Sequence, residues 1–264
     1  MIRHSGSTEK NARVQDWSKE YAEKDNLEFF AAALGELTKD DAGHGGLMTI
    51  GLLGQRDLPG VTLRHAQAVL RWDLRPSLWS HTFLVAGRLP DSGEIGKLPI
   101  REVSIYSRTG RFPEPANNAV SAATLDAYND PKVDANVALL AVAMSETEVE
   151  QVADRAISHP NLDRLRYDFW ETLGIWASYL WSGGLRPNPL REGFPMFSSA
   201  FVEYCYEAIP LDLSPAASER NSAPEHLWNS AVWWDEAFTE FRHPISGYFC
   251  LRDKGGALLD PEVS

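Results

Sequence analysis

The stretch FSSAFVEYCYEAIPLDLSP, residues Phe197–Pro215, decides the expected fold because it combines a helix start with an apolar face. Ser198 lies at the amino-terminal end of that face. A serine there is an ordinary N-cap, but a nucleophile at the same place would gain from unpaired N–H groups and the positive end of the helix dipole. The apolar residues recur at three- and four-residue spacing, which places them on one side of a helix: they are Phe201, Val202, Cys205, Ala208 and Ile209.

Two upstream segments are expected to form strands. WSHTFLVAG, Trp79–Gly87, contains His81 and a run of β-forming residues. Ile100–Arg108 alternates strictly, so that Glu102 shares one face with every second residue of the segment. If the two strands pair, the Glu102 carboxylate can reach the His81 imidazole.

These segments resemble the circularly permuted branch of the NlpC-type papain-like cysteine hydrolases. The nucleophile helix of that family has an apolar residue, Cys-Ser, a small residue and Phe-Val, and residues Phe197–Val202 match it with Ser198 in place of the cysteine. WSHTFLVAG is similar to the family's histidine strand, and RYDFWETLG, Arg166–Gly174, is similar to the Tyr-Asp segment before its nucleophile helix. The matching pieces lie within roughly Gly46–Trp234.

The resemblance implies an α+β, papain-like fold, in which an antiparallel sheet packs on helices and the nucleophile lies at a helix N-terminus. Residues 1–45 would be a helical N-terminal extension, and residues 46–264 the hydrolase domain, with a loop and helical insertion at about 109–160. By resemblance, Ser198 is the nucleophile, His81 the general base and Glu102 the group that orients the imidazole. The residues expected to line the substrate site are Trp79, Tyr167, Asp168, Phe197 and Ser199.

The implied activity is cleavage of an amide or related acyl bond, by a peptidase or amidase, through a covalent acyl-enzyme without a cofactor. The alternatives are a lipid acyltransferase or acylhydrolase of the lecithin retinol acyltransferase type, and a catalytically dead relative that binds a peptide or protein partner. An alcohol does not ionise near neutral pH as an activated thiol does. Ser198 therefore allows three interpretations: an engineered inactivating replacement, a natural serine hydrolase, or a natural inactive relative.

The composition of the chain limits the kinds of partner that the protein is expected to bind. The 264 residues carry a formal net charge of −12, which argues against nucleic acid and against anionic membrane surfaces as partners.

The two cysteines indicate reduced, buried thiols, which fit a cytoplasmic protein. The sequence contains no apolar run long enough for a signal or a membrane span. A substrate outside the cell would require delivery by a secretion system. Metal-binding spacings are absent from the sequence. Eight of the nine tryptophans cluster around residues 72–79, 170–181 and 228–234, which suggests core packing, a site or an amphipathic surface.

The remaining pattern predicts further elements. Ser145-x-x-Glu148 is a capping box at the start of a helix, and residues Thr109–Asp134 form a long loop. The expected helices are one or two in Asp16–Leu37, then Thr62–Arg71 with Thr62 as its cap, Ala135–Met144, Glu146–Ser158, Leu162–Trp181 and Glu225–Phe241, and the further expected strands are Leu47–Gly54 and Gly247–Arg252.

Overall fold

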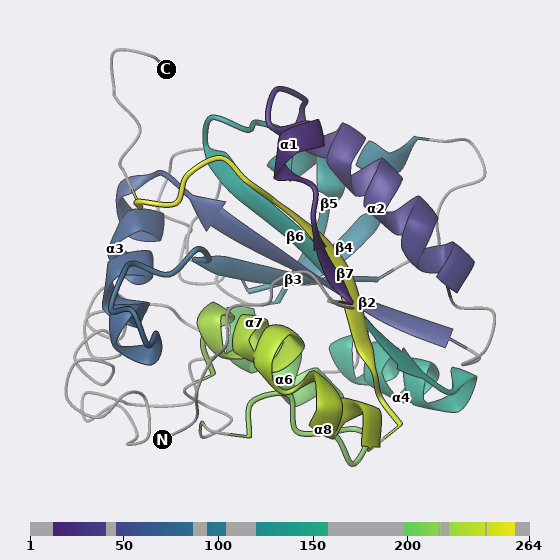
Figure 1. Ribbon diagram of the computed structural model, residues 1–264. Helices are drawn as coiled ribbons and strands as arrows, with labels where there is room; N and C mark the ends of the chain where they lie inside the picture. Colours follow the sequence, from purple (N-terminus) through teal and green to yellow (C-terminus); the bar gives the residue numbers. More distant parts are fainter. Residues whose placement is uncertain are drawn as a thin grey trace.

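A seven-stranded mixed sheet forms the centre of the computed structural model, which describes residues 13–40, 46–86, 94–103, 120–157, 198–215, 217, 222–240 and 242–256. The strand order is β1-β7-β6-β2-β3-β4-β5 (Figure 1). All neighbouring strands are antiparallel except β1 and β7, so the expected purely antiparallel sheet is wrong at that edge. The strands are β1 (Val14–Asp16), β2 (Gly46–Gln55), β3 (His81–Val85), β4 (Pro99–Glu102), β5 (Ser121–Thr124), β6 (Asp134–Met144) and β7 (Ile245–Leu251).

Helices cover both faces of this sheet. Figure 1 shows α1 and α2 on one side and α4, α6, α7 and α8 on the other, with α3 beside one end. The helices are α1 (Ser18–Tyr21), α2 (Asn26–Asp40), α3 (Leu58–Ala66), α4 (Glu146–Ile157), α6 (Ser198–Tyr206), α7 (Pro224–Trp233) and α8 (Asp235–Glu240), and short 3-10 turns occur at η1 (Gln67–Leu70), η2 (Ile95–Lys97) and η3 (Leu125–Tyr128). The described residues thus form a mixed fold that agrees with the α+β class.

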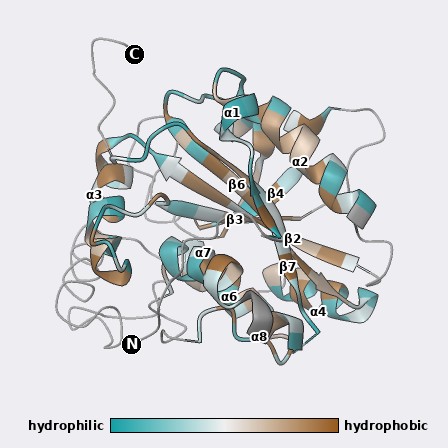
Figure 2. Cartoon of the chain, viewed as in Figure 1, coloured by the Kyte–Doolittle hydropathy of each residue, from teal (hydrophilic) through white to brown (hydrophobic). Residues whose placement is uncertain are grey.

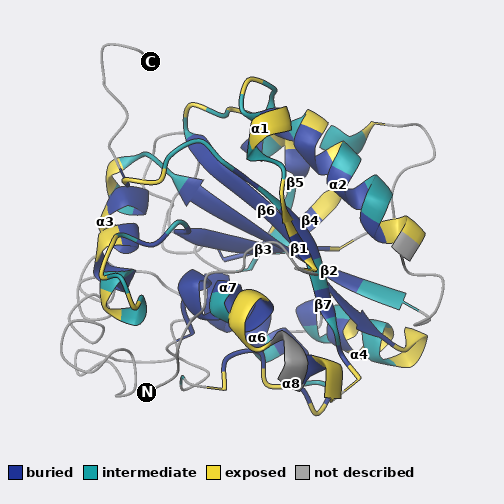
Figure 3. Ribbon diagram, viewed as in Figure 1, coloured by how far each residue is buried: buried dark blue, intermediate teal, exposed yellow. Residues whose placement is uncertain are grey.

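Side-chain alternation along the strands divides the apolar interior into two cores. Along β6, Val137 and Leu139 pack with α2, whereas Ala138 and Leu140 pack with α6 and α7. Apolar residues therefore run along both faces of the central strands (Figure 2), which are buried throughout most of their length (Figure 3). No helix in the described ranges is long and apolar enough to cross a membrane.

The expected helix at Ala135–Met144 is wrong, because these residues belong to strand β6. Every residue of β6 is buried, and the strand pairs with β2 on one side and β7 on the other. A strand covered on both faces has a continuous apolar run without alternation, and such a run resembles a buried helix. The described part of the proposed insertion at about 109–160 consequently contains a central strand of the sheet.

The N-terminal segment is also part of the main body rather than an extension. Strand β1 pairs with β7, and α2 inserts Phe29 and Phe30, both fully buried, into the core on its side of the sheet. One or two helices are expected within Asp16–Leu37, and the structure has two, α1 and α2, the second of which continues to Asp40.

Three helix boundaries depend on local chemistry. Helix α3 begins at Leu58, not Thr62, because the Asp57 carboxylate accepts a hydrogen bond from Gly60 N at 2.8 Å and caps it. The Ser145 capping box is confirmed: Ser145 N donates to Glu148 Oε2 at 2.8 Å, and Glu148 N donates to Ser145 Oγ at 3.3 Å. The single helix expected at Glu225–Phe241 is two helices, α7 and α8, that meet at Trp234. The helix expected at Leu162–Trp181 lies outside the described residues.

Candidate functional site

The pairing of β3 with β4 brings His81 and Glu102 together. The two strands are antiparallel, with Leu84 opposite Arg101, and His81 Nε2 lies 2.9 Å from Glu102 Oε2. Both side chains are more than nine-tenths buried. A carboxylate at this distance favours the tautomer with the proton on Nε2, which leaves Nδ1 as the ring nitrogen that can accept a proton.

Tyr128 is a third member of this cluster that the sequence did not reveal. Its hydroxyl lies 3.1 Å from His81 Nε2 and donates a short hydrogen bond to Glu102 Oε2. The phenol ring stacks on Phe83 with centroids 5.5 Å apart and an interplanar angle of 8°, which fixes its direction. Tyr128 ends the turn η3, inside a segment expected to be a loop, and no motif marks it. Only the folded chain brings it to His81.

Ser198 is the first residue of α6, as the sequence predicts, and the helix packs against β3. Its side chain is almost fully buried, and Ser198 Oγ accepts a hydrogen bond from Thr82 N at 3.1 Å. Thr82 follows His81 directly in the chain. The start of α6 therefore lies against the strand that carries the imidazole.

The contact between Ser198 and His81 is indirect. Pairing between β3 and β4 covers Leu84 and Val85 and does not extend to Thr82, so the Ser198 hydroxyl bonds a strand N–H where a ladder partner would otherwise lie. His81 points to the same side of β3 as Phe83, the side covered by α2. Within the described ranges no hydrogen bond joins Ser198 to the imidazole, and the direct contact expected from the sequence is not present.

The other predicted site residues have different surroundings. Trp79 is fully buried and packs against Trp228 with ring centroids 5.0 Å apart, so it belongs to the core and does not line an open site. Ser199 is also fully buried, and its hydroxyl donates to Ser222 O at 2.5 Å. Tyr167, Asp168 and Phe197 lie outside the described residues.

Two buried polar atoms beside His81 have no hydrogen-bond partner in the described structure: Trp79 Nε1 and Thr82 Oγ1. Buried polar atoms are satisfied in most proteins, and exceptions concentrate at functional positions. Both atoms lie within two residues of the imidazole along the chain. The start of β3 therefore contains two of the four buried side-chain atoms without a described partner, and the other two are Arg155 Nε and His243 Nδ1.

A buried carboxyl group fixes the rest of α6. Glu203 Oε1 accepts hydrogen bonds from Leu213 N at 2.8 Å and Ser214 N at 3.1 Å, and Ser214 Oγ donates to Glu203 Oε2 at 3.0 Å. Burial, together with the neighbouring Asp212, raises the pKa of Glu203 to about 8. This network ties the helix that begins at Ser198 to the segment that follows it.

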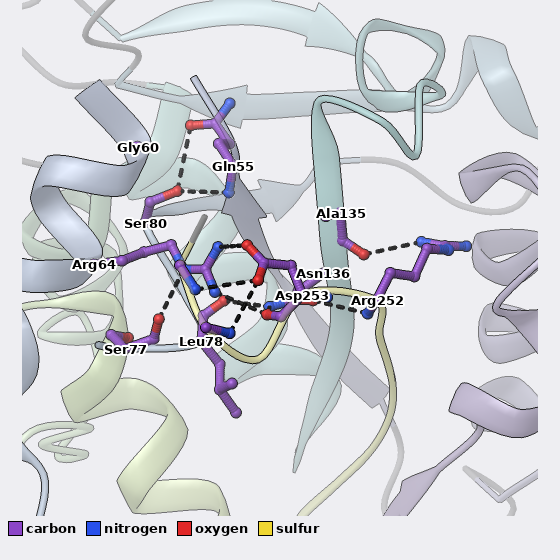
Figure 4. Close-up of polar contacts among 12 residues, drawn as sticks. Gln55, Gly60, Arg64, Ser77, Leu78, Ser80, Ala135, Asn136, Arg252 and Asp253 are labelled. Carbon is purple, nitrogen blue, oxygen red and sulfur yellow. Dashed lines mark hydrogen bonds and ion pairs between the residues drawn. The ribbon is translucent and has the colours of Figure 1, made fainter. Parts of the chain in front are cut away.

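A second polar network holds the segment that leads into β3 (Figure 4). Arg64 is fully buried, and its guanidinium donates to Ser77 O, Asp253 Oδ2 and Asp253 O, each at 2.8 Å. Asn136 Nδ2 donates to Leu78 O at 3.0 Å and to Asp253 O at 2.7 Å. We call the residues Arg64, Ser77, Leu78, Asn136 and Asp253 the Arg64 lock. It fixes the backbone three and four residues before His81.

Other titratable groups of the described residues lie in structural surroundings. Cys205 and Cys250 are free, buried thiols, and burial raises the pKa of each. Burial lowers the pKa of His226 to about 4, and its Nδ1 accepts a hydrogen bond from Ala223 N at 3.0 Å. His243 Nε2 lies 3.2 Å from Glu148 Oε1. Among the described residues, no group of three or more His, Cys, Asp or Glu side chains could hold a metal ion.

Comparison of the chain with family models, with curated proteins and with solved structures found no match.

Proposed function

We propose that the chain has the architecture of a papain-like acyl hydrolase, with Ser198 at the nucleophile position, His81 as general base and Glu102 as the group that orients the imidazole. The observation that carries the proposal is the His81–Glu102 hydrogen bond at 2.9 Å beside a helix that begins at Ser198. The resemblance of the three sequence segments supports the same assignment. The resemblance covers amidases and peptidases as well as lipid acyltransferases and acylhydrolases, and we propose an amide or peptide substrate.

The chemistry follows from the positions of the groups. The nucleophile attacks the carbonyl carbon of the substrate while His81 Nδ1 takes its proton, and the Glu102 carboxylate stabilises the resulting imidazolium through Nε2. N–H groups at the start of α6 face the oxygen that becomes negatively charged. The imidazolium then protonates the leaving group, and water hydrolyses the acyl-enzyme.

Catalysis requires His81 Nδ1 and the nucleophile to meet. His81 points to the α2 side of β3 and α6 packs on the other side, so both the imidazole and the start of α6 have to move. Thr82 N is one peptide bond from His81, and it holds Ser198 Oγ at 3.1 Å. We propose that substrate binding replaces the bond from Thr82 N and brings the nucleophile and the imidazole together around the start of β3.

The test is labelling of the Ser198→Cys variant with an electrophilic acyl probe. We expect stoichiometric labelling at position 198, and a fall of about 100-fold or more in its rate when His81 is also changed to Ala. Ser199→Cys is the matched control, since that neighbouring side chain is turned toward Ser222 O and should not react. The buried thiols of Cys205 and Cys250 should remain unlabelled in every variant.

The outcome separates the alternatives. A fluorophosphonate that labels the unaltered chain at Ser198 would identify a serine hydrolase. A well-folded Ser198→Cys protein that resists all acyl probes would refute the hydrolase proposal and favour a binding role for the same site.

A further inference from the structure

The outer side of α3 and the turn that follows it is an uncharged surface on an acidic protein. Between residues 56 and 75, only one of the exposed residues, Arg75, carries a formal charge at pH 7, although the chain has 37 acidic residues. Figure 3 shows exposed residues along the outer side of α3. The exposed positions, which we call the α3 stripe, are Leu58, Thr62, His65, Val69, Trp72, Leu74 and Arg75.

Three of the four apolar residues of the stripe have most of their surface in solvent. Trp72 is 80% exposed, Leu74 is 70% exposed and Leu58 is 67% exposed. Positions 58, 62 and 65 follow helical spacing on α3, position 69 lies on the 3-10 turn η1, and position 72 lies in the turn that follows it. Isolated exposed apolar residues are common, but a group of them that includes a tryptophan is typical of an interaction surface.

Hydrogen bonds within the turn Arg71–Arg75 fix the end of the stripe that contains Trp72 and Leu74. Arg71 Nε and Nη2 donate to the two Asp73 carboxylate oxygens, both at 3.0 Å, and Asp73 Oδ1 also accepts from Arg75 N at 3.1 Å. Arg71 Nη1 anchors the turn to the buried Glu225 at 3.1 Å. Leu74 has φ +54°, a left-handed conformation that a bulky residue rarely adopts. The turn thus accepts backbone strain while it holds two large apolar side chains in water.

We propose that the α3 stripe is a membrane-contact surface, which places Trp72 and Leu74 in the interfacial region of a zwitterionic lipid bilayer. Tryptophan is the residue most suited to the boundary between headgroups and acyl chains, and leucine beside it adds apolar contact. Arg75 can reach lipid phosphate groups while its stem stays near the apolar boundary. The carboxylate of Asp73, which lies between Trp72 and Leu74, is already neutralised by Arg71.

Charge favours a zwitterionic lipid surface over a second copy of the chain. Two copies would each carry a net charge of −12 and would repel one another. The net charge of −12 opposes an anionic bilayer. A zwitterionic surface suits both the uncharged stripe and the acidic remainder.

The proposal goes beyond the proposed hydrolase and does not rest on it. The turn Arg71–Arg75 precedes β3 by only five residues, so docking would hold the His81 end of the sheet near the lipid surface. Binding can nevertheless be measured without catalysis. The His81→Ala variant should bind vesicles as the unaltered protein does, which keeps failure of one proposal separate from failure of the other.

The experiment is co-flotation of the full chain with phosphatidylcholine vesicles. We expect the unaltered protein to float with the vesicles, and the double variant Trp72→Ala/Leu74→Asn to bind about tenfold or more weakly. Asparagine tolerates the left-handed conformation of position 74, so the variant should unfold at no lower a temperature than the parent. Trp234→Ala is the matched control, because Trp234 is 45% exposed on α7–α8 and outside the stripe, and it should bind as the parent does.

Brominated phosphatidylcholine gives a direct second readout. Its bromine atoms should quench part of the tryptophan fluorescence of the parent, and Trp72→Phe should abolish that part. Added phosphatidylserine should weaken binding at low ionic strength because of the net negative charge. Absence of vesicle binding by the parent, or equal binding by the parent and the double variant, would overturn the proposal. A parent that instead forms dimers lost in the double variant would assign the stripe to a second copy and likewise overturn it.

Discussion

Two buried polar clusters lie at the two ends of the segment before and within β3, and they differ in how completely their groups are matched. In the Arg64 lock, a guanidinium donates three hydrogen bonds of 2.8 Å to a carboxylate and two backbone carbonyls. In the cluster around His81, the Glu102 carboxylate contacts an imidazole and a phenol. Two polar atoms close to His81 along the chain, Trp79 Nε1 and Thr82 Oγ1, have no hydrogen-bond partner within the described residues.

The difference separates a cluster that stabilises the fold from one suited to chemistry. Arginine stays protonated, so the Arg64 lock has a single charge state at physiological pH. An imidazole that contacts a carboxylate and a phenol can instead act as a proton donor or acceptor in a reaction. Function commonly occupies places where stability is not at its maximum. Substitutions in the two clusters should therefore have different signatures.

The largest expected effect is on stability, from Arg64→Ala. The substitution leaves the Asp253 carboxylate and Ser77 O without their buried donor, so the free energy of unfolding should fall by about 3–5 kcal/mol. Urea denaturation measures it. Lys39→Ala is the control, because the exposed Lys39–Glu36 pair at 2.6 Å should be worth less than about 1 kcal/mol. Equal effects from the two substitutions would contradict the assignment of Arg64 as a lock.

A second effect concerns pH and Glu203, a buried carboxyl group that lies near Asp212 rather than in an ion pair like that of Asp253. The pKa of Glu203 is raised from 4.5 to about 8, chiefly by burial. The folded state therefore binds this proton more tightly than the unfolded state does, and the resulting stability is complete below pH 4.5 and is lost as the pH rises to about 8.

Thermal or urea unfolding should show that the free energy of unfolding falls by on the order of 3 kcal/mol as the pH rises through this range. In Glu203→Gln this fall should be largely absent. Glutamine keeps the shape of the side chain and an oxygen for the N–H groups of Leu213 and Ser214. If Glu203→Gln retained the full pH dependence, another group would be responsible. The first to consider is Glu225, whose pKa burial raises to about 7.

The sequence predicted those parts of the molecule that depend on neighbours along the chain. The start of α6 at Ser198, the Ser145 capping box and the alternation that turns Glu102 toward His81 are all local patterns, and each is present. Strand β6 was mistaken for a helix because burial on both faces removes the periodicity on which the prediction relies.

Other features follow only from tertiary structure. Tyr128 joins His81 because η3 folds back beside β3, at a separation of 47 residues that no local pattern encodes. The Ser198–Thr82 bond exists because β4 stops pairing with β3 before Thr82. The side of β3 on which His81 lies depends on which helix covers that face, and the arrangement of helices around the sheet was not predictable from the sequence.

Thr82→Val should have a smaller effect on stability than Arg64→Ala, and it should increase stability. Thr82→Val replaces a buried hydroxyl that has no described partner by a methyl group of similar shape, so the free energy of unfolding should rise by about 1 kcal/mol. Valine also suits a strand. Differential scanning calorimetry checks the sign, with Thr49→Val, at a buried threonine outside the cluster, as a matched control. A loss of stability in Thr82→Val would show that the hydroxyl has a structural partner and would weaken the contrast with the Arg64 lock.

The smallest expected change in stability comes from Tyr128→Phe. The ring keeps its stacking on Phe83, and only the hydroxyl that bonds Glu102 and lies 3.1 Å from His81 Nε2 is lost, so unfolding should change by about 1 kcal/mol or less. Labelling of a Ser198→Cys background should slow more, by about tenfold, because the carboxylate and imidazole lose the group that fixes their relative orientation.

The comparison of the two readouts decides what Tyr128 does. If the labelling rate of Tyr128→Phe falls while its free energy of unfolding is unchanged, Tyr128 acts together with His81. If the free energy of unfolding falls as in Arg64→Ala and the labelling rate is unchanged, Tyr128 has a structural role instead. Addition of Glu102→Gln to the same variant sharpens the result, because two residues that act through one imidazole should show non-additive effects on the labelling rate.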